Sequence, residues 1–289
     1  MSKKWVKMRE IRADLHTHFG HTADRAREYG FDRIVEHASE KLGEGGILGI
    51  ADFFGNYGTH FHYGEFAQLE SDKYEKVDLG NGIYVPQKDL LVVRGEEIAV
   101  SHEGEECHLL VFGSDELGVP SVEVGTDVLA AVRGLDFNRV SVLDHPFFAH
   151  GALAKIGVTR VKTHNLLAEI DGIEVFNGMA ALFPGANKKA EIVYVGKDEH
   201  YYTFGGIISS DAHSLEDMGS SYSILRTGMD YSGLERPSEV TWGLRKAIRS
   251  IGETSVGIPP EGKRTPLIRS ASKHALEVII NRMLKGKIK

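Results

Sequence analysis

The chain has 289 residues, 42% of them hydrophobic and 26% charged, with a formal net charge of −7 at pH 7. This composition is normal for a globular protein and excludes a largely disordered chain or a nucleic-acid-binding protein with an overall basic surface. No apolar run approaches the roughly 20 residues of a spanning helix, so we expect no membrane partner. We expect a cytoplasmic protein, because the first residues lack an export signal and a single cysteine excludes an intrachain disulfide.

Short apolar strands alternate with helical patterns along the chain, which predicts a mainly parallel sheet covered by helices. Each predicted strand begins with residues typical of a protein interior and ends in polar or metal-binding residues. The predicted strands are 11–18, 45–54, 90–100, 107–113, 140–146, 170–177 and 204–213. Helical periodicity predicts helices over 31–42, 126–132, 186–194 and 240–251, and a closing helix near 267–284.

The stretch from 56 to 87 interrupts this alternation and contains "LGNGIYV", which predicts a hairpin turn. We interpret the stretch as an insertion on one barrel loop. No repeat or linker divides the chain, so we expect a single domain over 1–289, with a core over 11–258 and a basic C-terminal helix over 263–289. That last segment carries eight Lys or Arg and one acid, which is typical of a solvated helix face; contact with nucleic acid or phosphate is the alternative.

Histidines and acidic residues gather at the ends of five predicted strands. They are Asp14, His16, His18, Glu97, His108, Asp144, His145, Asp211 and His213. Because the carboxyl ends of parallel barrel strands lie on one face, we expect these side chains to converge in one cleft. His16 and His18 lie two residues apart in one strand and therefore face the same side. Such a set of nitrogen and oxygen ligands suits Zn²⁺, Mn²⁺ or Fe²⁺.

Seven short motifs follow one another between Ala13 and His213. They are "DLHTH", "ILGIAD", "VRGEEIAV", "CHLLVFG", "VLDHP", "GIEVFN" and "SSDAH". In content and order they resemble the PHP (polymerase and histidinol phosphatase) domain family. The resemblance implies an α/β fold, a distorted (β/α)7 TIM-like barrel, and the activity of a metal-dependent phosphoesterase.

The resemblance also implies which residues hold metal ions. One ion would be surrounded by His16, His18, Glu97 and Asp211. Glu97 would bridge this ion to a second one, with Glu96 as the alternative bridge. The second ion would be held by Glu97, His108 and His145.

A third ion is in doubt because Phe53 stands where the family has a histidine. Its remaining ligands would be His213 and His21, or Asp24 in place of His21. Asp52 is one alternative source of the missing ligand, and the others are His60 and His62 if the inserted loop folds back. We therefore expect two or three divalent ions.

Two divalent ions bridged by a carboxylate can lower the pKa of a water held between them, which supplies a hydroxide for attack on phosphorus. His213 is a candidate general acid beside Asp211, and Asn177 is a candidate hydrogen-bond donor to bound phosphate. Glu174 is as well explained by a structural role. Asp14 and Asp144 are candidates for orienting ligand histidines, or for capping and turn roles.

The leading hypothesis is hydrolysis of a small phosphomonoester, because the chain is acidic. A nuclease or phosphodiesterase acting on oligonucleotides or nucleotide bisphosphates is the alternative, favoured only by the basic last segment. An amidohydrolase-like enzyme is a third possibility, but no lysine is a candidate for its usual bridging ligand. A degenerate regulatory domain would need lost ligands, and only Phe53 fits that description.

Overall fold

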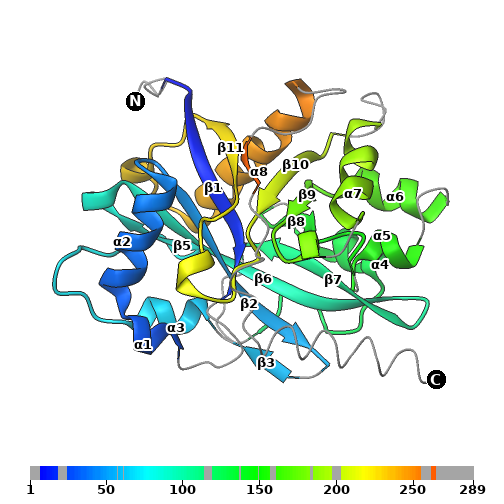
Figure 1. Ribbon diagram of the computed structural model, residues 1–289, viewed down its shortest axis with the longest axis horizontal. Coiled ribbons are helices and arrows are strands. Elements are labelled where there is room, and N and C mark those ends of the chain that lie inside the picture. The colour runs from blue at the N-terminus through cyan, green and yellow to red at the C-terminus, as the bar shows by residue number, and fades with distance from the viewer. Residues whose placement is uncertain are drawn as a thin grey trace.

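A strongly curved sheet organises the fold (Figure 1). The structure is a computed structural model and describes residues 7–18, 25–56, 58–60, 62–113, 119–136, 138–148, 150–156, 161–182, 185–196, 203–254 and 262–264. Seven strands follow one another around a nearly closed barrel: β1 (Arg9–Thr17), β2 (Ile47–Gly55), β6 (Leu90–His102), β7 (Glu105–Phe112), β8 (Val140–Leu143), β9 (Gly172–Asn177) and β10 (Gly205–Ser209). Each overlaps a strand expected from the sequence, and the prediction of a distorted (β/α)7 barrel is confirmed.

One strand of the barrel runs against the others. β1, β2 and β6 are parallel to one another, as are β8, β9 and β10. β7 is antiparallel to both of its neighbours, β6 and β8. The expectation that every strand brings its carboxyl end to the same face is therefore wrong for β7. Its first residues lie at that face instead, and these include His108.

Shorter strands extend this sheet or fold back on it. They are β3 (Gly58–His60), β4 (Val77–Asp78), β5 (Gly82–Val85), β11 (Tyr222–Thr227) and β12 (Gly262–Lys263). β11 pairs with β1 and β12 with β11, whereas β3 folds back on β2 and the β4–β5 pair lies against β6. The turn between β4 and β5 falls at 79–81, inside the stretch for which the sequence predicts a hairpin.

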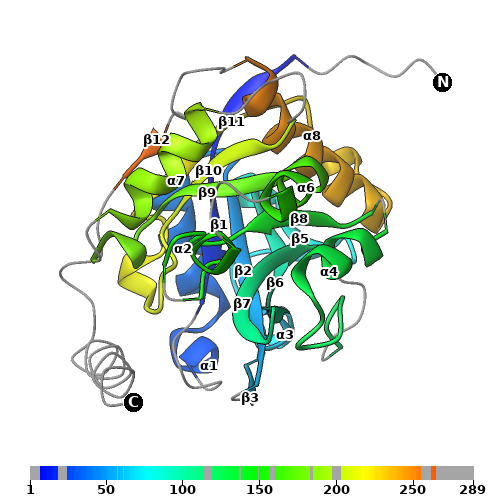
Figure 2. The same ribbon diagram turned by 90° about the vertical axis from the view of Figure 1, so that its right-hand side faces the viewer.

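Helices cover both flanks of the sheet (Figures 1 and 2). They are α1 (Arg25–Tyr29), α2 (Phe31–Leu42), α3 (Tyr63–Gln68), α4 (Val128–Gly134), α5 (Ala152–Ile156), α6 (Val161–Glu169), α7 (Ala186–Val195) and α8 (Pro237–Thr254). α1 to α3 lie on the left of Figure 1 and α4 to α7 on its right. In both views α8 lies at the top and β3 at the bottom, so these two elements mark opposite ends of the barrel. No helix among the described residues is long and apolar enough to cross a membrane.

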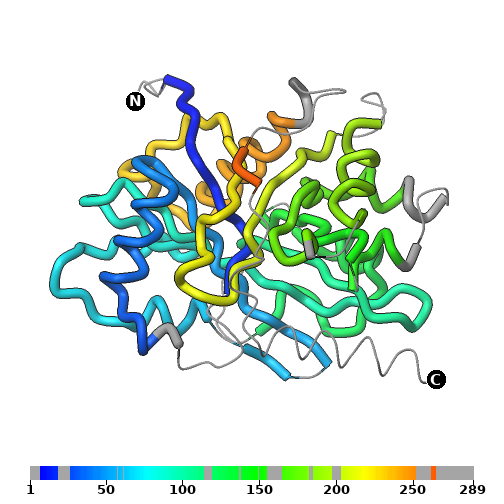
Figure 3. Tube along the Cα trace, in the orientation of Figure 1, coloured from blue at the N-terminus to red at the C-terminus, as the bar shows by residue number. Residues whose placement is uncertain are grey.

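The barrel closes where β1 meets the chain that follows β10 (Figure 3). Thr17 and Ala212 form a parallel bridge. The His18 amide donates to the Ala212 carbonyl over 2.6 Å, and the Asp211 amide donates to the His16 carbonyl over 2.8 Å. The backbone groups that close the barrel therefore belong to, or lie next to, the predicted ligands His16, His18 and Asp211.

An extra residue in β1 turns its histidines into the barrel. Asp14 pairs with Leu48 and Thr17 with Ile50, so three steps along β1 match two steps along β2. Leu15 belongs to the apolar cluster inside the barrel, yet the adjacent His16 also faces the interior. Such a bulge breaks the alternation of faces that a regular strand imposes.

Some expectations fall on residues outside the described part of the chain. His21 and Asp24 are among them, as is most of the expected C-terminal helix, including its segment 267–284. The helix was expected to begin at Lys263, and here the structure differs. Lys263 belongs to β12, because Gly262–Lys263 pair with β11.

The bulge of β1 depends on close approach to Gly49. A Cβ added at Gly49 would lie 2.7 Å from the carbonyl carbon of Leu15, which is backbone and cannot turn away. We expect Gly49→Ala to lower the free energy of unfolding by roughly 1–3 kcal/mol, as overpacking does. Urea unfolding measures the change. Gly134→Ala is the control, because a Cβ there meets nothing within 4 Å; equal stability of the two variants would contradict the prediction.

Candidate metal centre

Glu97 is a buried carboxylate whose two oxygens face two different groups of histidines. Its Oε2 lies 3.2 Å from His18 Nε2 and 3.6 Å from His16 Nε2. Its Oε1 lies 2.6 Å from His108 Nδ1 and 3.2 Å from His145 Nε2. This is the arrangement that a carboxylate bridging two cations requires.

Glu96, the alternative bridge, faces away from the barrel interior. Its Oε2 accepts a hydrogen bond from the Ser121 amide over 2.7 Å, and its Oε1 lies 3.4 Å from the Arg94 guanidinium. Neighbouring residues of a strand point to opposite sides, so β6 can present only one of the two glutamates to the histidines.

The first group consists of His16, His18, Glu97 and Asp211. The Nε2 atoms of His16 and His18 are 3.1 Å apart, and Asp211 Oδ1 lies 3.7 Å from the first and 3.8 Å from the second. Tetrahedral zinc with Zn–N bonds of 2.0–2.1 Å spaces its ligand atoms by about 3.3 Å. The separations among His16, His18 and Glu97 are close to this value, so these three side chains fit one divalent ion, and Asp211 Oδ1 lies beside both histidines.

Hydrogen bonds hold both histidines with Nε2 toward the centre. His16 Nδ1 lies 2.9 Å from Glu174 Oε1, and His18 Nδ1 lies 3.0 Å from the Ala51 carbonyl oxygen. A proton on each Nδ1 satisfies these contacts and leaves each Nε2 as a lone pair. Two lone pairs 3.1 Å apart repel each other unless a cation or a proton lies between them.

The second group consists of Glu97, His108, Asp144 and His145. One ligand atom from each lies within 4.8 Å of all the others, and all four residues are buried. His108 enters from the start of the reversed strand β7, while Asp144 and His145 directly follow β8. Burial raises the pKa of Asp144 to about 7.

The buried carboxylates of the centre favour the binding of protons or cations nearby, and this raises the pKa of the adjacent histidines. At His16 burial acts to lower the pKa, but the charges of Glu174 and Asp211 outweigh it and raise the pKa well above its usual value. In the same way the charge of Glu97 overcomes burial at His108 and raises its pKa to about 10. Either protons or metal ions can bind there, and an ion that binds has to displace the protons.

The third ligand group is only partly assembled among the described residues. His213 lies beside His18, with ring centres 5.0 Å apart, and its Nδ1 is 3.0 Å from the Asp211 carbonyl oxygen. One ligand atom each from His18, Asp211 and His213 lie within 4.8 Å of one another. The inserted loop does fold back: His62 is buried, and its ring centre is 5.9 Å from that of His18.

Asp52 and Phe53 occupy opposite sides of β2. Asp52 Oδ1 accepts hydrogen bonds from the His62 and Tyr63 amides at the start of α3, and its Oδ2 lies 3.4 Å from Arg94. Of the alternative sources of the missing third-site ligand, Asp52 is therefore disfavoured, because its carboxylate contacts the start of α3 and Arg94. Phe53 is in register with Glu97, and its ring packs against His108.

Asn177 and Glu174 lie behind the ligands. The Asn177 amide nitrogen is 2.9 Å from Glu174 Oε2 and 3.2 Å from Asp211 Oδ2. Glu174 also accepts hydrogen bonds from Ser209 Oγ and, over 2.6 Å, from the His145 amide. Both side chains are fully buried, so this geometry favours roles in orienting His16 and Asp211. The role of Asn177 toward a phosphate stays a prediction.

Asp14 fastens the barrel and does not touch the ligand nitrogens. Its carboxylate accepts hydrogen bonds from the Ser210 amide, the Ser210 hydroxyl and the Gly219 amide, over 2.9, 2.5 and 2.8 Å. Of the two roles considered from the sequence, the structure favours the turn role for Asp14.

Glu106 and His150 are two further residues that the sequence pattern did not single out. Glu106 Oε1 lies 3.6 Å from His108 Nε2 and 3.5 Å from His150 Nδ1. Glu106 therefore stands at the nitrogen of His108 that faces away from Glu97. In the sequence, Glu106 stands two residues before His108, which places both side chains on the same side of β7 and is the pattern that indicates their contact.

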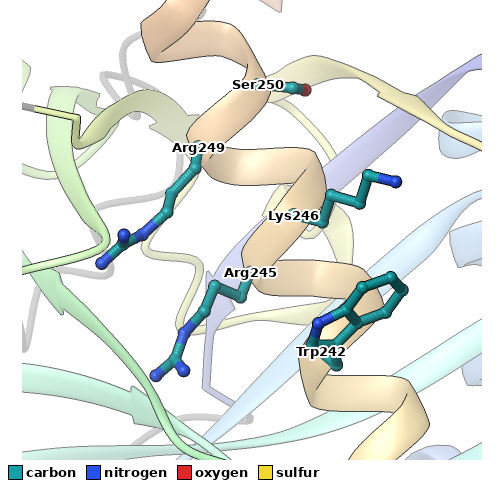
Figure 4. Close-up of a pocket in the computed structure, with 5 residues that line it drawn as sticks. All are labelled: Trp242, Arg245, Lys246, Arg249 and Ser250. Carbon is teal, nitrogen blue, oxygen red and sulfur yellow. The ribbon is translucent and has the colours of Figure 1, made fainter. Parts of the chain in front are cut away.

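A hollow on the outside of α8 lies apart from this centre. Its lining residues are Trp242, Arg245, Lys246, Arg249 and Ser250 (Figure 4). Ile248 of the same helix packs against Gly172 and Gly205, which begin β9 and β10. The hollow is thus at the opposite end of these strands from the ligands.

Comparisons with known proteins identify relatives in fold but none in sequence. No family model matches the chain, and no curated protein matches it. PsfC from Pseudomonas syringae shares the fold with a TM-score of 0.51 and 12% identity, over 97% of this chain and 99% of PsfC. The lesion-specific endonuclease PfuEndoQ from Pyrococcus furiosus gives a TM-score of 0.52 and 12% identity.

The match to PfuEndoQ covers 84% of this chain but only 56% of the endonuclease. A two-domain protein from Bacteroides vulgatus, described as containing a predicted PHP-like metal-dependent phosphoesterase, matches with a lower TM-score of 0.46 at 13% identity, over 92% of this chain and 69% of that one. At these identities the matches to PsfC and PfuEndoQ show a common fold and no more.

Glu174 fixes the tautomer and orientation of His16, and this predicts a measurable effect on metal binding. We expect Glu174→Gln to weaken binding of a divalent ion by about 10–100-fold, the usual cost of losing a partner that orients a ligand. Titration of chelator-stripped protein with Mn²⁺ or Zn²⁺ against a competing indicator measures the affinity. Glu169→Gln, an exposed carboxylate paired with Arg133, is the control. Unchanged affinity in Glu174→Gln would show that His16 needs no such support.

Proposed function

We propose that this protein is a metal-dependent phosphoesterase. One divalent ion would be held by His16, His18, Glu97 and Asp211, and a second by Glu97, His108 and His145. The observation that carries the proposal is the placement of Glu97, whose two oxygens each face a different pair of histidines at 2.6–3.6 Å. When bound, such a pair of ions supplies a water of lowered pKa and stabilises negative charge on phosphoryl oxygens.

The residues of the chain contribute orientation and proton transfer. Hydrogen bonds from His16 Nδ1 to Glu174 and from His18 Nδ1 to the Ala51 carbonyl orient both rings with Nε2 toward the proposed ion, also in the metal-free protein. Asn177 donates to Asp211 Oδ2, which leaves Asp211 Oδ1 toward the histidines. His213 is partly exposed, and its Nδ1 lies 3.0 Å from the Asp211 carbonyl oxygen, so we assign it the role of the general acid that protonates the leaving group.

A small phosphomonoester is the substrate class that the charge of the chain supports. The net charge of −7 does not attract a long polyanion. A nuclease is the second candidate, supported by the basic segment after Lys263 and by a fold shared with an endonuclease. Ending the chain at Arg264 and measuring how oligonucleotide binding depends on salt separates the two. An unchanged slope would remove the support that the basic segment gives to a nuclease.

The decisive experiment measures hydrolysis with and without metal. We expect chelator-stripped protein to be inactive, and Mn²⁺, Zn²⁺ or Fe²⁺ to restore phosphate release from some member of a panel of phosphomonoesters, nucleotide bisphosphates and oligonucleotides. Glu97→Gln should lower the restored rate by about 10³-fold or more, equivalent to ~4 kcal/mol. Glu96→Gln is the matched control, since that carboxylate faces Arg94, and should bind metal normally. Protein that binds metal but hydrolyses nothing in the panel would contradict the proposal.

The proposed role of His213 predicts a dependence on the leaving group. His213→Gln should slow hydrolysis of an alkyl phosphate by about 10²–10⁴-fold, the usual contribution of a general acid. It should affect p-nitrophenyl phosphate much less, because nitrophenolate leaves without a proton. Steady-state kinetics on the two substrates test this. An equal loss on both would assign His213 to metal binding instead of proton transfer.

A further inference from the structure

Asp144 is a buried carboxylate without a hydrogen bond from any residue that the structure describes. Its exposed fraction is 0%, and its described ion pair is with His145, whose Nε2 lies 3.3 Å from Oδ2 without forming a hydrogen bond. Once His145 is neutral, as a metal ligand must be, a proton or a cation has to neutralise Asp144, because a buried charge without a partner is strongly unfavourable. By contrast, the buried carboxylates of Asp14 and Glu174 each accept several hydrogen bonds.

The position of Asp144 differs from that of a residue that merely orients a histidine. Glu174 shows the orienting position, because it contacts His16 through Nδ1, on the far side of the ring from the centre. Asp144 Oδ2 instead lies 3.3 Å from Nε2 of His145. That nitrogen is the one that faces Glu97 Oε1 at 3.2 Å. Asp144 therefore stands among the ligand atoms.

The backbone after β8 explains how two consecutive residues reach the same space. Val142 belongs to the interior apolar cluster, so strand alternation sends Asp144 to the interior as well. His145 would then point outward, but its φ of 23° lies in the left-handed region and turns it back. The chain thus brings both side chains to Glu97.

We propose that Asp144 is a fourth protein ligand of the second metal ion, together with Glu97, His108 and His145. This inference rests on the two-ion centre of the proposed function and deepens it. The second ion then has two nitrogen and two carboxylate ligands, a set richer in oxygen that suits Mn²⁺ better than a histidine-rich set does. Asp144 also supplies the negative charge that balances the ion in a buried place.

The test compares metal content and spectra of variants loaded with Mn²⁺ alone. We expect Asp144→Asn to hold one ion fewer per chain than the wild type, through a loss of second-site affinity of about 100-fold. Electron paramagnetic resonance should show that the signal of two coupled Mn²⁺ ions gives way to that of an isolated ion. His145→Gln, which removes a ligand of the same ion, should give the same result.

Glu169→Gln is the control, because this exposed carboxylate pairs with Arg133 far from the centre and should leave the number of bound ions unchanged. Thermal unfolding with and without Mn²⁺ adds a second measurement. Mn²⁺ should raise the melting temperature of Asp144→Asn less than that of the wild type, each relative to its own metal-free form, because the variant holds one ion fewer.

Three outcomes are distinct. If Asp144→Asn keeps as many coupled ions as the wild type, or if Mn²⁺ raises its melting temperature as much as that of the wild type, Asp144 is a structural residue and the inference is overturned. If the wild type binds fewer than two ions, the centre itself is wrong and the inference falls with it. If the wild type binds two coupled ions, Asp144→Asn loses one and no phosphoester is hydrolysed, the inference holds and the proposed function fails.

Discussion

The centre depends on the closure of the barrel between the end of β1 and residues 210–212. Two backbone hydrogen bonds join His16 to Asp211 and His18 to Ala212, and Asp14 holds Ser210 by its amide and its hydroxyl. Buried backbone groups need such partners, so closure satisfies the hydrogen-bonding groups at the strand ends and also positions three candidate ligands. An ion held by His16, His18 and Asp211 would in turn cross-link the two ends of the barrel, so metal binding and folding would be coupled.

β6 separates two buried networks of charge that are balanced in different ways. On the outer side the guanidinium of Arg94 lies 3.4 Å from Asp52 and 3.4 Å from Glu96, so a fixed cation faces the carboxylates. On the inner side the described ion pairs of Glu97 are all with histidines. Histidines are neutral once they bind metal, and only an added cation can then balance the inner carboxylate. This contrast distinguishes a structural charge network from a site that accepts a ligand.

Strand positions, and the side of a strand on which each residue lies, could be predicted from the sequence because they follow from periodicity. Two-residue alternation places His16 and His18 on one side of β1. The choice of Glu97 over Glu96 rests on the resemblance of "VRGEEIAV" to the Gly-x-Glu strand of a known family. The sequence pattern does not reveal where alternation fails. The bulge before His16 and the reversal of β7 depend on pairing with strands distant in sequence. Asp52 is disfavoured as a third-site ligand because its carboxylate caps α3, a contact that only the folded insertion creates.

The backbone at the ligands shows that the donor positions are built into the fold. His145 and Asp211 both have positive φ, 23° and 52°, and a non-glycine residue in this region costs of order 1–3 kcal/mol. The surrounding structure holds both: the Asp211 amide is bonded to the His16 carbonyl, and the His145 amide to Glu174. Glycine at either position would relieve the strain but remove a candidate ligand. The strained backbone at His145 and Asp211 therefore lies where a regular strand end would direct these two side chains away from Glu97.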